Sequence, residues 1–63
     1  MCLAKAYLSE DGGEDLVMED VALLRIKGKK LLLNSLFGEQ KEIEGLIKEV
    51  NFQNSKLVIE KLA

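Results

Sequence analysis

The one soft, reactive side chain in this 63-residue chain is a cysteine at position 2, within the opening MCLAKAY. The chain contains no histidine. It therefore has no Ser-His or Cys-His nucleophile pair, no HExxH zinc helix and no imidazole that titrates near neutral pH. Two roles remain for Cys2: metal ligation, or packing as a small buried apolar side chain, which is what most free cysteines do.

As a metal ligand, Cys2 offers two donor atoms. If Met1 is removed, the amine and thiol of Cys2 close a five-membered ring on a metal. If Met1 stays, a deprotonated backbone amide replaces the amine. One nitrogen and one sulfur are too few, but a two-fold homodimer with adjacent termini supplies two of each. Four planar N/S donors suit Ni(II) and also Cu, and suit the usually tetrahedral Zn less well.

The acidic residues do not form a recognisable site. Carboxylates cluster at Glu10–Asp11, Glu14–Asp15 and Glu19–Asp20. Neighbours in a strand point to opposite faces, and the segment EDGGED lacks the ligand order of a calcium loop. No GxxxxGK[ST] or GxGxxG phosphate loop is present. We therefore expect neither an enzyme nor an organic cofactor.

The segment RIKGKK holds the densest positive charge in the chain. Its four cations are Arg25, Lys27, Lys29 and Lys30. On a hairpin tip they could contact RNA phosphates or a protein edge, although lysines also keep edge strands soluble. The net charge of −2 and the scattered aromatics Tyr7, Phe37 and Phe52 argue against general nucleic-acid binding. A binding module therefore remains the alternative to a metal-handling protein.

Short apolar runs bounded by turn residues predict an all-β chain. We expect turns at Gly12–Gly13, Gly28–Lys29, Phe37–Gly38–Glu39 and Gln53–Asn54–Ser55. Gly45 predicts a bulge or a sharp bend. The segments EGLIKEVNF and SKLVIEKLA also fit a helical period over short windows, so a helix at either place stays open.

These elements predict one domain, residues 1–63, folded as a six- or seven-stranded antiparallel barrel of SH3-like or Sm-like type, since an open sheet of this size leaves edges exposed. Strand alternation puts Cys2, Ala4, Ala6 and Leu8 on one face. A chain of this length buries only ~60% of its unfolded surface, so a homodimer would help to stabilise it.

The chain also lacks the marks of export or membrane insertion. A lone cysteine forms no internal disulfide, and Lys5 interrupts the only early apolar stretch. No segment approaches the ~20 apolar residues needed to cross a bilayer. We expect a soluble cytoplasmic protein with a free thiol and no membrane partner.

Four segments resemble the CooT family of small nickel-binding proteins: MCLAKAYL, DLVMEDVALLRIKG, LFGEQKEIEG and the closing strand pair. The resemblance implies a homodimer of small β-barrels, of a kind once labelled RNA-binding from its fold. It implies Cys2 as the ligand of a transiently bound Ni(II). It also implies a metallochaperone that delivers nickel to an enzyme such as carbon monoxide dehydrogenase.

Overall fold

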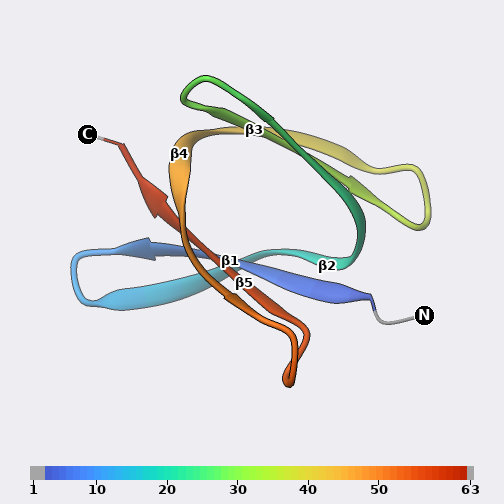
Figure 1. The fold of residues 1–63 in the computed structure, drawn as a ribbon, viewed down its shortest axis with the longest axis horizontal. Coiled ribbons are helices and arrows are strands. Elements are labelled where there is room, and N and C mark those ends of the chain that lie inside the picture. The colour runs from blue at the N-terminus through green and yellow to red at the C-terminus, as the bar shows by residue number, and fades with distance from the viewer. Residues whose placement is uncertain (1–2, 63) are drawn as a thin grey trace.

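The computed structural model describes residues 3–62, and every regular element in that range is a β-strand. The strands are β1 (Ala4–Glu10), β2 (Gly13–Lys27), β3 (Lys30–Ser35), β4 (Gln40–Asn51) and β5 (Lys56–Lys61). They close into a barrel (Figure 1). The predicted all-β barrel is confirmed, and the two segments that also fit a helical period contribute residues 44–51 to β4 and residues 56–61 to β5. None of the described residues belongs to a helix long and apolar enough to cross a membrane.

The ring closes through its first and last strands. Neighbours along the chain, from β1–β2 to β4–β5, pair antiparallel. The closing pair, β1 with β5, is parallel, with Lys5 opposite Lys56 and Leu8 opposite Ile59. The barrel is therefore antiparallel except at this seam, which the sequence analysis did not anticipate.

Two strands are long because each changes its partner part-way along. β2 pairs with β1 as far as Val21 and with β3 from Val21 onward. Asp20 has a φ of 55° at this corner. β4 pairs with β3 as far as Glu44 and with β5 from Gly45. The halves of β2 and of β4 look like separate apolar runs in the sequence, so the expected six or seven strands are five.

Gly45 marks a close approach between strands. A Cβ at this position would lie 2.6 Å from the Glu60 carbonyl oxygen and 2.9 Å from Ile59 Cγ2. The Gly45 N–H donates to the Lys29 carbonyl oxygen at 2.9 Å, which links β4 to the β2–β3 turn. At Gly45 β4 changes its partner from β3 to β5, whereas the register shift lies further along, between Ile47 and Glu49, and not at the predicted glycine.

Turns lie at all four predicted places, but the first is shifted by one residue from Gly12–Gly13 to Asp11–Gly12. In the β1–β2 turn the positive φ values fall on Asp11 (46°) and Gly12 (80°), and Gly13 already begins β2. Two consecutive positive φ angles are the mark of the type I′ turn that suits a two-residue hairpin. In the β4–β5 turn the Asn54 N–H donates to Asn51 Oδ1 at 3.0 Å.

The core fills the inside of the barrel. Its buried members are Ala6, Met18, Val21, Leu31, Leu33 and Ile59. Leu31 and Leu33 are buried, while Leu32 lies between them on the outer face and lines a surface hollow. Strand alternation thus divides the three consecutive leucines between the two faces, as the sequence requires.

Candidate metal centre

Cys2, the candidate nickel ligand, lies outside the described residues, which begin at Leu3. β1 follows directly and is flanked by β2 and β5. Ala6 is fully buried in the core, and Ala4 and Leu8 pack against that core. The shared face predicted for this strand is therefore confirmed for Ala4, Ala6 and Leu8, and it faces the core.

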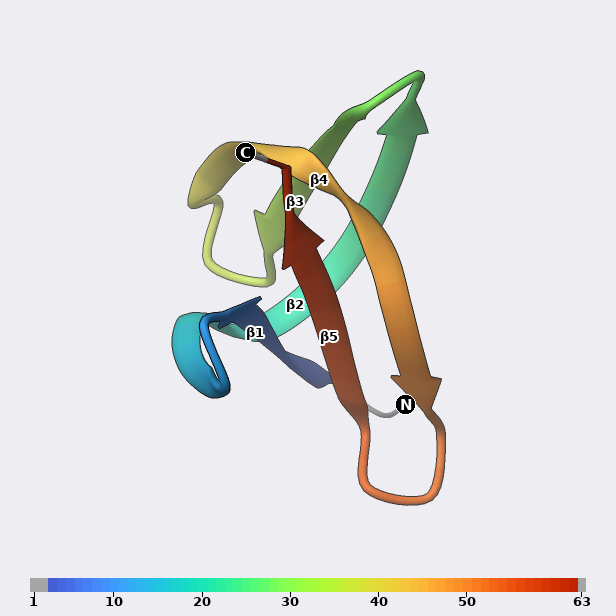
Figure 2. The ribbon, with the colours of Figure 1, turned by 90° about the vertical axis from the view of Figure 1, so that its left-hand side faces the viewer.

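The tip of the β4–β5 hairpin lies beside the start of β1. The Lys5 N–H donates to the Ser55 carbonyl oxygen at 2.9 Å. Figure 2 shows the start of β1 alongside the lower part of β5, next to the hairpin turn. The described part of the chain therefore begins at this end of the molecule.

An apolar hollow of about 220 Å³ opens at this end. Its carbon-rich wall comes from Ala4, Val50, Phe52 and Leu57, and Asn51, Ser55 and Lys56 complete it. Phe52 is 88% exposed and Val50 is 43% exposed. A ring this exposed gains little from burial within its own chain, so the hollow presents apolar surface to the solvent.

A more polar hollow of about 280 Å³ lies beside it, lined by Leu3, Lys5, Tyr7, Asn54, Ser55 and Lys56. Lys56 Nζ lies 2.9 Å from Glu14 Oε1 and 5.0 Å from the centre of the Tyr7 ring. The hydrogen bond to Glu14 raises the pKa of Lys56 above its ordinary value. A lysine must lose its proton to bind a metal, so Lys56 is unsuited as a nitrogen ligand here.

The glutamate of each of the three acidic clusters lies close to a lysine. Glu10 lies 3.3 Å from Lys61, and Glu19 lies 3.8 Å from Lys5. Across residues 3–62, no three side chains of Asp, Glu, His or Cys come close enough together to hold a metal ion. The described part of one chain therefore does not complete a metal site.

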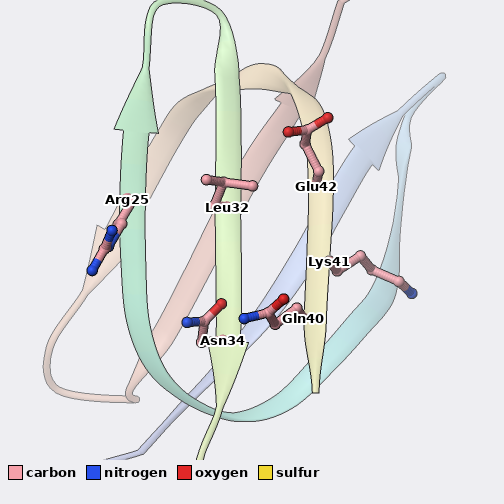
Figure 3. Close-up of a pocket in the computed structure, with 6 residues that line it drawn as sticks. All are labelled: Arg25, Leu32, Asn34, Gln40, Lys41 and Glu42. Atoms are coloured by element: carbon pink, nitrogen blue, oxygen red, sulfur yellow. The ribbon is translucent and has the colours of Figure 1, made fainter. Parts of the chain in front are cut away.

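The basic cluster lies on the β2–β3 hairpin. Lys27 pairs with Lys30 across the turn that contains Lys29, and Arg25 lies further along β2. Arg25 lines a shallow outer hollow of about 400 Å³ with Leu32, Asn34, Gln40, Lys41 and Glu42 (Figure 3). Carboxylates face this cluster, because Lys30 lies 3.9 Å from Glu42 and opposite Glu44. The four cations thus share one hairpin, but part of their charge is balanced locally.

Comparison with known proteins identifies the family. The profile described as CO dehydrogenase accessory protein CooT matches residues 1–60. This chain belongs to the CooT family. A crystal structure assigned as CooT, from Carboxydothermus hydrogenoformans, matches with a TM-score of 0.90 at 29% identity and covers 98% of this chain and 100% of that one. An uncharacterized protein of Methanocaldococcus jannaschii is 42% identical over 60 residues, or 95% of this chain and 98% of that protein.

The family match confirms two expectations from the sequence. The resemblance to CooT extends over nearly the whole chain. CooT is described as an accessory to CO dehydrogenase, so the family is one of accessory proteins and not of enzymes.

Sequence reasoning missed the apolar hollow beside the start of β1. Val50 and Phe52 come from one end of the β4–β5 turn, Leu57 from the other, and Ala4 from a strand about fifty positions away. Only the parallel β1–β5 seam of this CooT barrel brings them together. One local signal was present: Phe52 is a large aromatic residue directly before the polar turn Gln53–Asn54–Ser55.

Proposed function

We propose that this CooT-family protein binds one Ni(II) between the Cys2 residues of two chains and passes it to a nickel enzyme such as CO dehydrogenase. The family assignment over residues 1–60 supports this proposal, because an accessory protein of CO dehydrogenase has that enzyme as a possible recipient of its cargo. The protein then acts as a cytoplasmic metallochaperone of one domain per chain, and nickel is its cargo. Reduced thiols in that compartment keep Cys2 available as a ligand.

The need for two chains follows from the count of donors. Each Cys2 brings one sulfur and one main-chain nitrogen, and residues 3–62 contribute no cluster of three ligating side chains. A two-fold axis doubles the contribution of one chain to two sulfurs and two nitrogens. Ni(II) and Cu(II) favour a square-planar arrangement of four such donors, whereas Zn(II) is usually tetrahedral.

Nickel titration of the wild type and of Cys2→Ser tests the proposal. Thiolate coordination gives a sulfur-to-nickel charge-transfer band in the wild type, and we expect its loss in Cys2→Ser. Met18→Leu is the matched sulfur control, because Met18 is buried in the core and Leu preserves its volume. Native mass spectrometry should give one nickel per two chains. A band of equal strength in Cys2→Ser would refute Cys2 as the ligand.

Recognition of RNA or of a protein edge by Arg25, Lys27, Lys29 and Lys30 is the alternative function. Their clustering on the exposed β2–β3 hairpin supports it, and the facing carboxylates Glu42 and Glu44 weaken it. A gel shift with single-stranded RNA at low and moderate salt tests the nucleic-acid form. Binding to phosphates is strongest at low salt. If no complex forms even at low salt, RNA is ruled out as the ligand.

A further inference from the structure

The proposed metal site restricts how two chains can meet. Consecutive Cα atoms are ~3.8 Å apart, and a metal–sulfur bond is ~2.3 Å long. Two chains that share one ion through Cys2 must therefore bring their Leu3 residues within roughly 20 Å of each other. The barrel is 32 Å in its longest dimension. A dimer formed through the far end of the molecule, such as the β2–β3 hairpin, does not meet this condition.

Two exposed aromatic surfaces remain within reach of the start of β1. One is the apolar hollow with Phe52 at its edge. The other surrounds Phe37, which is 75% exposed in the β3–β4 turn and shares a hollow with Leu16. The two differ in charge. Glu19, Asp20 and Glu39 line the Phe37 hollow, whereas no carboxylate lines the Phe52 hollow.

We propose that a second copy of this chain docks on the apolar hollow at the β4–β5 hairpin, with Phe52 of each copy as the anchor. This inference rests on the proposed function, because the shared nickel requires the starts of β1 to be close together. In a two-fold dimer the same patch meets itself, so any uncompensated charge on the patch meets its own copy. The Phe52 hollow avoids acidic repulsion, and the Phe37 hollow does not.

The hollow also suits an aromatic ring in size and chemistry. A cavity of about 150 Å³ with apolar walls accepts benzene, and this hollow measures about 220 Å³. Lys56 is the one cation in its wall, and its ammonium is bound to Glu14 at 2.9 Å on the Tyr7 side. Each Phe52 ring can thus leave water and pack against Ala4, Val50 and Leu57 of the partner copy.

The test measures self-association of the metal-free protein by sedimentation and native mass spectrometry over a dilution series. Phe52→Asp should raise the dimer dissociation constant roughly 30-fold or more, as loss of a central aromatic anchor does. Ile26→Asp is the control, because Ile26 is 63% exposed near the distant β2–β3 hairpin. This substitution should change the dimer dissociation constant less than threefold. Circular dichroism of each variant verifies the fold.

A second experiment tests the interface by crosslinking and does not require a variant that breaks the dimer. In a Cys2→Ser background, Phe52→Cys should form a crosslinked dimer with a short bis-maleimide, and Ile26→Cys should not. A monomeric wild type, a dimer that resists Phe52→Asp, or a dimer that Phe37→Asp dissociates instead would overturn the inference. A dimer that depends on Phe52 but binds no nickel would support the interface and refute the proposed function, so the two failures are distinguishable.

Discussion

Lys56 and Glu14 form an ion pair of 2.9 Å that spans β1 on the outside of the barrel. Glu14 lies near the start of β2 and Lys56 at the start of β5, the two strands that flank β1. The Tyr7 side chain of β1 lies beneath the ammonium, 5.0 Å from ring centre to Nζ. The pair therefore links both neighbours of the strand that follows Cys2.

This pair should stabilise the fold in a way that depends on pH. The hydrogen bond to Glu14 raises the pKa of Lys56 in the folded state. A raised pKa gives stability that is complete below the unfolded value of about 10.4 and is lost as pH rises through the folded value. The wild type should be more stable than Glu14→Gln at pH 7, and the difference should shrink above pH ~10.4. Urea unfolding at pH 7 and pH 11 measures it, with Glu39→Gln as the control. A difference that grows at high pH would contradict this assignment.

Gly45→Ala should destabilise the barrel. The added Cβ would meet the Glu60 carbonyl oxygen at 2.6 Å, and backbone cannot move aside as the end of a side chain can. Forced overpacking of this kind lowers the free energy of unfolding by about 1 to 3 kcal/mol. Gly13→Ala is the control, because its nearest neighbour, the Glu10 carbonyl oxygen, would be 3.8 Å away. Equal midpoints of urea unfolding for the two variants would show that β4 and β5 can move apart to accommodate the added Cβ without loss of stability.

Ser35→Ala should loosen the β3–β4 turn. The Ser35 hydroxyl accepts hydrogen bonds from the Phe37 and Glu39 N–H groups, each at 3.1 Å, and the residue is only 6% exposed. Loss of a buried acceptor lowers the free energy of unfolding by about 1 to 3 kcal/mol. Faster amide exchange at Phe37 and Glu39 should accompany this change. Ser9→Ala removes an exposed hydroxyl with a single contact at 3.4 Å and should leave stability and exchange unchanged.

Nickel affinity should fall on acidification. A thiol must lose its proton to bind the metal, and its ordinary pKa is about 8.5. If one ion binds two Cys2 thiolates, the thiols alone give the logarithm of the association constant a slope of about two per pH unit between pH 6 and 7.5, and the two main-chain nitrogens, which also lose a proton, raise the slope toward about four. Competition titrations with a nickel chelator measure this slope. A flat profile would mean that no thiol proton is released.

Local signals in the sequence predicted the strands and turns well. Gly12 and Gly28 have the positive φ values that mark their turns, although the first turn is Asp11–Gly12 and not the predicted Gly12–Gly13, and the short apolar runs mark the strands. The number of strands could not be counted in this way. At Val21 and at Gly45 a strand continues while its partner changes, and a partner change depends on residues far along the chain.

Only part of the candidate site could be predicted from the sequence. Cys2 stands out by residue type and by the absence of histidine, so the sequence alone selects it. The Phe52 hollow and the Lys56–Glu14 pair join segments about fifty and about forty positions apart. They exist only once the parallel seam between β1 and β5 has formed, so no local pattern could reveal them.

The parallel seam also sets an order of events during synthesis. β1 leaves the ribosome first, yet one of its two neighbours is β5, the last strand to be made. Until then its β5-facing edge has no ladder partner, and the hairpin wall beside Leu3 does not exist. If a second copy docks on this wall, as proposed above, its docking must therefore wait until β5 has been made.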